Sequence, residues 1–136
     1  MIDWEPILRE AGGLHDQAMG YVTQARLLQT PGQRFEERAC LREAFERASK
    51  AASALADSAA PEPSRAIIHR SAASLAVSLG DIQEARELLL RALAGRPDDR
   101  LRWELEDFLN ELPIATNSRL DHSKTPPSPK QLLQAA

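Results

Sequence analysis

Three histidines and one cysteine are the side chains of this sequence best suited to metal binding, acid–base or nucleophilic chemistry. They are His15, His69, His122 and Cys40. No two of them stand at the short spacing typical of zinc ligands. Cys40 lies in an alanine-rich segment, where burial as a small hydrophobic residue is expected. The chain also lacks glycine-rich phosphate-binding, nucleophile-elbow and HExxH motifs. We therefore expect no catalytic activity, no metal and no cofactor; a helical-bundle enzyme or ligand binder would need side chains that only the fold brings together.

A second set of side chains is suited to binding another protein. It consists of Ile67, Arg70, Ser74 and Ser78. At helical spacing these residues share one face, away from the apolar stripe of Ile68 and Leu75. An arginine with two hydroxyls can hydrogen-bond a peptide carboxylate or backbone. The alternative is a face that is solvated or covered by the N-terminal hairpin.

Residues 98–112 are the other candidate binding surface. They carry six acidic side chains against Arg100 and Arg102. Trp103 lies roughly 200° around the helix from Leu101, off the apolar stripe. We expect Trp103 to pack on the preceding hairpin, the alternative being an exposed anchor for a partner. An inhibitor-like or antitoxin-like regulator of a neighbouring gene product would use this acidic helix.

Composition sets the fold class and narrows the partners. The chain has 22 alanines and 19 leucines but only two valines, which predicts an all-α fold. A net charge of −3 argues against nucleic acid. The absence of a long apolar run argues against a membrane span. A single cysteine suits a reducing, cytoplasmic location. The alanine-rich core is thin, so a homodimer is also possible.

Periodicity and stop signals divide the chain into four or five main helices. A short opening helix to Glu10 is expected to break at Gly12–Gly13 and to be followed by a helix from Leu14 to about residue 28. A long helix is expected over 33–57. Its apolar stripe, which begins at Phe35 and Ala39, is expected to face the core. Further helices are predicted over 64–79, 81–94 and 98–112, with Ser64, Asp81 and Asp98 or Asp99 as their N-caps.

The segment 66–99 resembles one tetratricopeptide repeat. The matching positions are Gly80–Asp81, Glu84–Ala85, Leu89, Ala92–Leu93 and Pro97. Gly80 permits the tight turn, while Ala85 and Ala92 allow close helix approach around Leu89. The first helix departs from the family pattern, since of its usual side chains only the small residue, at Ala73, is kept. The segment 41–51 matches weakly, and Trp103 stands at the tryptophan position of a next repeat.

The resemblance implies antiparallel helical hairpins in a short right-handed bundle or solenoid, with the acidic last helix as its cap. It also implies that the face of Arg70, Ser74 and Ser78 lines a concave groove for a peptide or protein partner. The expected organisation is a helical domain over 1–113 followed by a flexible, Pro/Ser-containing tail over 114–136. The predicted function is that of a non-catalytic adaptor or interaction module.

Overall fold

The structure is a computed structural model that describes residues 1–113, and helices are the only regular elements in that part of the chain. They are α1 (Trp4–Arg26), the short 3₁₀ turn η1 (Pro31–Gln33), α2 (Arg34–Ala54), α3 (Ser64–Ser78), α4 (Ile82–Leu93) and α5 (Asp99–Glu111). The all-α prediction is confirmed. The predicted tail, 114–136, lies outside the described residues.

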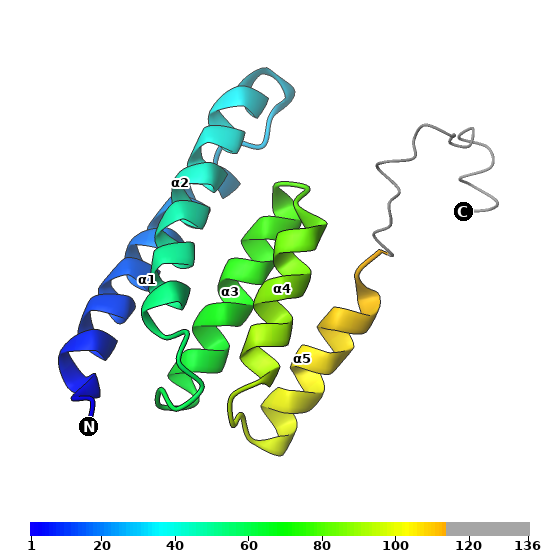
Figure 1. The fold of residues 1–136 in the computed structure, drawn as a ribbon. Helices are drawn as coiled ribbons and strands as arrows, with labels where there is room; N and C mark the ends of the chain where they lie inside the picture. The colour runs from blue at the N-terminus through cyan, green and yellow to red at the C-terminus, as the bar shows by residue number, and fades with distance from the viewer. Residues whose placement is uncertain (114–136) are drawn as a thin grey trace.

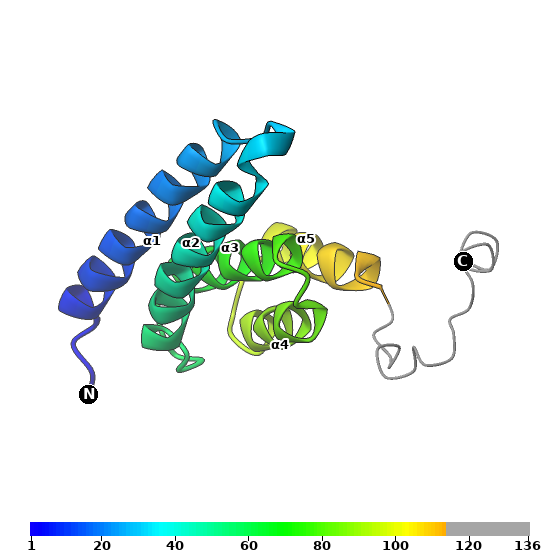
Figure 2. The ribbon, with the colours of Figure 1, turned by 90° about the horizontal axis from the view of Figure 1, so that it is seen from above.

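Successive helices run antiparallel and pack side by side. The α1–α2 hairpin stands at one end, the α3–α4 hairpin in the middle and α5 at the other end (Figure 1). Packing joins α1 to α2, α2 to α3, α3 to α4 and α4 to α5. Viewed from above, α3 and α5 lie on one side and α4 on the other (Figure 2). Since α2 contacts both α1 and α3, it determines how these two helices face each other.

Local chemistry sets the N-termini of α4 and α5 and the turn between α3 and α4. The carboxylate of Asp81 accepts a hydrogen bond from the Glu84 amide at 3.2 Å, and that of Asp98 accepts one from the Leu101 amide at 2.8 Å. Both aspartates therefore act as N-caps, as predicted. Gly80 has a φ of +83°, the left-handed conformation that favours glycine between α3 and α4. The Ser64 prediction is wrong, because the N-cap position of α3 belongs to Pro63.

Alanine forms most of the core, which lets the helices approach closely. On α2 the buried positions are Ala44, Ala48, Ala51 and Ala52. The two residues predicted to open the inward stripe of α2 are instead solvent-facing: Phe35 is 79% exposed and Ala39 is also exposed. They lie in the first turns of α2, where no residue is buried and only Glu37 and Cys40 are half-buried; the buried positions of the helix begin at Ala44.

The predicted break at Gly12–Gly13 is also wrong, because α1 is continuous through both glycines. Two glycines cost a helix about 1 kcal/mol each relative to alanine. Packing along α2 opposes that cost, since Ala11 and Ala18 on either side of the pair are fully buried. Tertiary burial therefore outweighs local propensity here.

Arg65 ties the two hairpins together from inside the protein. Its side chain is fully buried. Its guanidinium donates to the carbonyl oxygens of Ala56 and Asp57 after α2, both at 2.9 Å. It also donates to those of Arg91 at 2.9 Å and Ala92 at 3.3 Å in the last turn of α4. Asp57, Arg91 and Ala92 also accept from the backbone amides of Ala60, Ala94 and Gly95, so the guanidinium adds a second donor at these carbonyls and joins the ends of α2 and α4.

Gly95 leaves the space that this arrangement needs. A Cβ atom at this position would lie 2.6 Å from Arg65 Nη1 and 2.6 Å from Glu62 Oε2. Glu62 in turn accepts hydrogen bonds from the amides of Ala66 at 3.1 Å and Arg96 at 2.9 Å. The glycine predicted only as a helix stop is thus also required by the close approach of Arg65 and Glu62.

Candidate functional site

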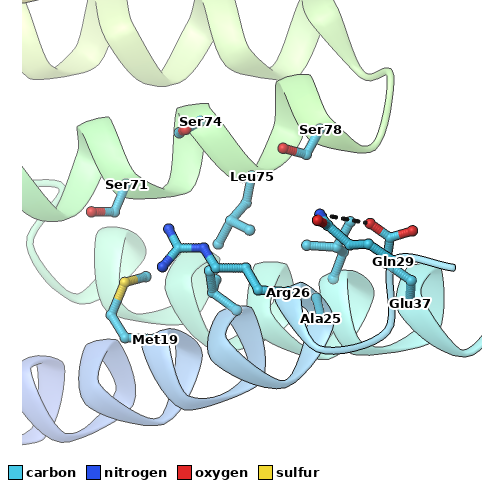
Figure 3. A pocket seen from close by; sticks show the side chains of 11 residues that line it. Met19, Ala25, Arg26, Gln29, Glu37, Ser71, Ser74, Leu75 and Ser78 are labelled. Atoms are coloured by element: carbon cyan, nitrogen blue, oxygen red, sulfur yellow. Dashed lines mark hydrogen bonds between the residues drawn. The ribbon is translucent and has the colours of Figure 1, made fainter.

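An open groove of about 500 Å³ runs between α1 and α3, with α2 beneath it (Figure 3). Its lining residues are Met19, Val22, Ala25, Arg26 and Gln29 of α1 and the following turn, Glu37 and Leu41 of α2, and Ser71, Ser74, Leu75 and Ser78 of α3. The groove therefore combines apolar side chains with a few polar groups, a composition typical of ligand sites.

The α3 wall is a row of hydroxyls. Ser71, Ser74 and Ser78 follow one another at i, i+3 and i+7, which places them on one face of the helix. Their hydroxyl groups stand along the edge of the groove (Figure 3). Each hydroxyl can both donate and accept a hydrogen bond, so the row can pair with the N–H and C=O groups of a ligand backbone.

The α1 wall repeats at the same spacing with different chemistry. Met19, Val22 and Arg26 come at i, i+3 and i+7, and the Arg26 side chain projects into the groove (Figure 3). At one end of the groove, the Gln29 amide donates to Glu37 Oε2 at 3.4 Å. This weak contact leaves most of the donor and acceptor capacity of both side chains available to a ligand.

The groove continues past Ser78 toward η1 as a smaller hollow of about 290 Å³. Arg34 and Arg38 line this extension, together with Thr30 and Pro31. Arg38 donates to the carbonyl oxygen of Leu79 at 3.1 Å. Within residues 1–113, no ion pair involves Arg26 or either of these two arginines. Three arginines and a single acidic residue, Glu37, therefore line the groove and its extension.

The structure separates the residues predicted to share the binding face. Ser74 and Ser78 line the groove, whereas Ile67 and Arg70 do not. Ile67 is partly buried against the core. Arg70 Nη1 instead forms an ion pair with Glu104 of α5, with 36% and 33% of the two side chains exposed. Arg70, two helical turns before Ser78, thus forms a contact between α3 and α5 instead of lining the groove.

The predicted packing of Trp103 on the preceding hairpin is wrong. Its side chain is 64% exposed on α5. By contrast, Ala85, Leu89 and Ala92 are fully buried in α4, and Pro97 is buried before α5. The repeat-like positions of residues 80–97 therefore form the packed middle of the array, while the tryptophan that follows them faces solvent.

Sequence reasoning missed the α1 side of the groove altogether. Of Met19, Val22 and Arg26, only Val22 belongs to the apolar stripe expected for the helix from Leu14, and nothing in the types of Met19 and Arg26 indicates a groove wall. Ser71 was missed as well, although its spacing from Ser74 and Ser78 extends the same face by one turn. These groove residues are identified only by the placement of α1 beside α3, and that placement depends on long-range packing.

In the described part of the chain, two histidines and the cysteine are buried or half-buried. His69 is fully buried, and its Nδ1 lies 2.8 Å from the Arg65 carbonyl oxygen, so Nδ1 carries the proton and donates. Burial lowers the pKa of His69, opposed in part by that hydrogen bond. Cys40 is half-buried, with its Sγ 3.8 Å from Gln24 Oε1. His15 is also half-buried, and His122 lies outside the described residues.

Two general properties of residues 1–113 bear on the site. No group of three or more His, Cys, Asp or Glu side chains in this range is placed to hold a metal ion. No helix in this range combines the length and the apolar character needed to cross a membrane.

Comparisons of the chain with protein-family models, with curated proteins and with solved structures gave no match.

Proposed function

We propose that this protein is a non-enzymatic, tetratricopeptide-repeat-like interaction module of the cytoplasm, which binds a peptide segment of a protein partner between α1 and α3. The observation that carries the proposal is the groove of about 500 Å³ between the first helices of two successive hairpins. The resemblance of residues 66–99 to a tetratricopeptide repeat implies a ligand surface on this side of the array.

The chemistry of the groove indicates how such a peptide is held. Apolar side chains of the ligand contact Met19, Leu41 and Leu75, and its backbone pairs with the serine hydroxyls. Because Arg26, Arg34 and Arg38 outnumber Glu37, an acidic side chain in the ligand gains favourable electrostatic energy. The favoured ligand is therefore a peptide with apolar residues next to an aspartate or glutamate.

A random-peptide display library, selected on the full-length protein, tests this function. Ser74→Tyr fills the groove from an exposed position of α3, and Ser53→Tyr adds the same ring at an exposed position of α2 outside the groove. Peptides enriched for apolar and acidic residues should bind Ser74→Tyr at least about 10-fold more weakly, a difference of about 1.4 kcal/mol. Binding to Ser53→Tyr should match that of the unmodified protein.

Both substitutions are at the surface, so the melting temperatures of both variants should stay close to that of the parent. Arg26→Gln should reduce the affinity for acidic peptides and the dependence of that affinity on salt. Peptides that bind Ser74→Tyr and the parent equally would show that the groove between α1 and α3 is not the ligand site.

A further inference from the structure

Helix α5 ends the described array with one side uncovered. Its buried residues are Leu101 and Leu105, whereas α3, in the middle of the array, buries eight of its residues. The exposed residues of α5 are Asp99, Arg100, Trp103, Glu106, Asp107, Asn110 and Glu111. We call these seven residues the outer face of α5. Nothing among residues 1–113 packs over it.

Trp103 occupies the middle of this outer face. At 100° per residue, the seven exposed positions span an arc of about 140°, and Trp103 lies about 10° from its centre. The indole is 64% exposed. A large, rigid aromatic side chain that stands in solvent within a ring of polar residues is the arrangement found at the centres of protein interfaces.

The charges around the indole specify the partner. The outer face holds the carboxylates of Asp99, Glu106, Asp107 and Glu111 against the guanidinium of Arg100. Arg100 is already directed at Glu104, with its Nε 3.4 Å from Glu104 Oε2. No ion pair among the described residues involves the four carboxylates of the outer face. The carboxylates around the indole therefore outnumber the positive charges of Arg100 and of the half-exposed Arg102 next to it.

From these observations we propose that the outer face of α5 docks a basic, partly apolar segment of a protein partner, with Trp103 as the anchor. Apolar side chains of the segment cover the indole, and its lysines or arginines pair with the surrounding carboxylates or stack on the ring. A second copy of this chain is a poor occupant, because a symmetric contact would bring the two acidic faces together.

This surface is distinct from the groove. The groove lies between α1 and α3, whereas the outer face lies at the far end of the array on α5 (Figure 1). The Arg70–Glu104 ion pair connects α3 to α5 on the side that faces the array. The two surfaces can therefore be occupied at the same time, which would let the protein hold an acidic, apolar peptide and a basic partner together.

The test uses a second selection from the random-peptide library on the full-length protein, with counter-selection on Trp103→Ala. The enriched sequences should combine lysine or arginine with apolar residues. By fluorescence polarisation, these peptides should bind Trp103→Ala at least about 30-fold more weakly, the change expected for an interface anchor. The Glu106→Lys/Asp107→Lys variant should also bind weakly, while Ser74→Tyr should bind normally. This last result separates the proposal from the groove function.

Phe35→Ala is the matched control, because Phe35 is another aromatic residue in solvent, 79% exposed at the opposite end of the array. It should leave the affinity unchanged. Trp4→Phe leaves Trp103 as the sole tryptophan, since the chain has two. In that variant, the peptides should shift the indole emission to shorter wavelength as they exclude water from the ring.

Three results would overturn the proposal. The first is a set of enriched peptides that lack basic residues or that bind Trp103→Ala as tightly as the parent. The second is a dimer, seen by sedimentation, that Trp103→Ala abolishes, since the outer face would then belong to a second copy. The third is a change in the emission of unliganded Trp103 when Arg119, Lys124 and Lys130 are replaced by serine, since the chain itself would then occupy the face.

Discussion

Replacing Arg65 by methionine should destabilise the protein strongly, although the residue touches no part of the groove. Methionine preserves the length and apolar character of the side-chain stem but removes every hydrogen-bond donor. The guanidinium makes three hydrogen bonds of 2.9 Å, to Ala56, Asp57 and Arg91, and a longer one of 3.3 Å to Ala92. Its removal breaks these bonds, although Asp57, Arg91 and Ala92 keep their backbone partners in Ala60, Ala94 and Gly95.

The expected loss follows from those contacts. A hydrogen bond contributes about 0.5–1.5 kcal/mol net to stability, and the three bonds of 2.9 Å are partly buried. At about 1 kcal/mol each, their loss gives about 3 kcal/mol. With a urea slope of about 2 kcal/mol per M, the unfolding midpoint should fall by about 1.5 M.

Urea titration followed by far-ultraviolet circular dichroism measures this shift. Arg65→Lys keeps the charge but not the forked donors, so its stability should lie between those of the parent and Arg65→Met. Arg70→Met is the matched control: it removes a partly exposed ion pair with Glu104 and should cost less than about 1 kcal/mol. If Arg65→Met unfolds within 1 kcal/mol of the parent, taken as about 0.5 M in the midpoint, the assignment of Arg65 as the tie between hairpins is wrong.

Two further predictions concern stability. Gly95→Ala should lower the free energy of unfolding by about 1–3 kcal/mol, because its Cβ would lie 2.6 Å from both Arg65 Nη1 and Glu62 Oε2. Gly13→Ala, with no atom within 4 Å of the new Cβ, should raise the free energy of unfolding by about 0.5–1 kcal/mol. Equal midpoints of the two variants in thermal melts would contradict both expectations. Since burial holds the pKa of His69 below its unfolded value of about 6.5, stability should be complete above that pH and should fall on acidification by at most about 1.4 kcal/mol per pH unit, until the pH passes the folded pKa. Urea midpoints measured from pH 7.5 to 4.5 should show a smaller decline in His69→Leu than in the parent, and parallel declines would exclude His69 as the source.

The parts of the fold that local chemistry controls could be predicted from the sequence. Gly80, Asp81 and Asp98 set helix boundaries through backbone conformation and capping, which depend on a few neighbouring residues. The burial of Ala85 and Leu89 also followed from their spacing in α4. These features need no knowledge of where other helices lie.

The errors arose where distant packing decides the outcome. Gly12–Gly13 would interrupt an isolated helix, but burial of Ala11 and Ala18 against α2 maintains it. Trp103 stands at a position where the repeat pattern expects burial, and only the arrangement of α4 and α5 shows that it faces solvent.

For the same reason, only one wall of the groove could be predicted from the sequence. The α3 wall could be recognised from the hydroxyl spacing of Ser74 and Ser78, since that depends on a single helix. The α1 wall, with Met19 and Arg26, depends on two helices that are far apart in the sequence and share α2 as a neighbour. Arg70 was assigned to the groove because no local signal indicates its ion pair with Glu104.

The buried alanines of α2 have a consequence for how ligand preference can evolve. Because α2 packs against both α1 and α3, the size of its inward side chains sets the separation of the groove walls. Ala48 and Ala51 have no exposed surface, so a ligand cannot touch them. A change from alanine to glycine or valine there would nevertheless narrow or widen the groove by a fraction of a side chain. Selection for a new ligand can therefore act on residues that never meet it, and the walls can keep their chemistry while the fit changes.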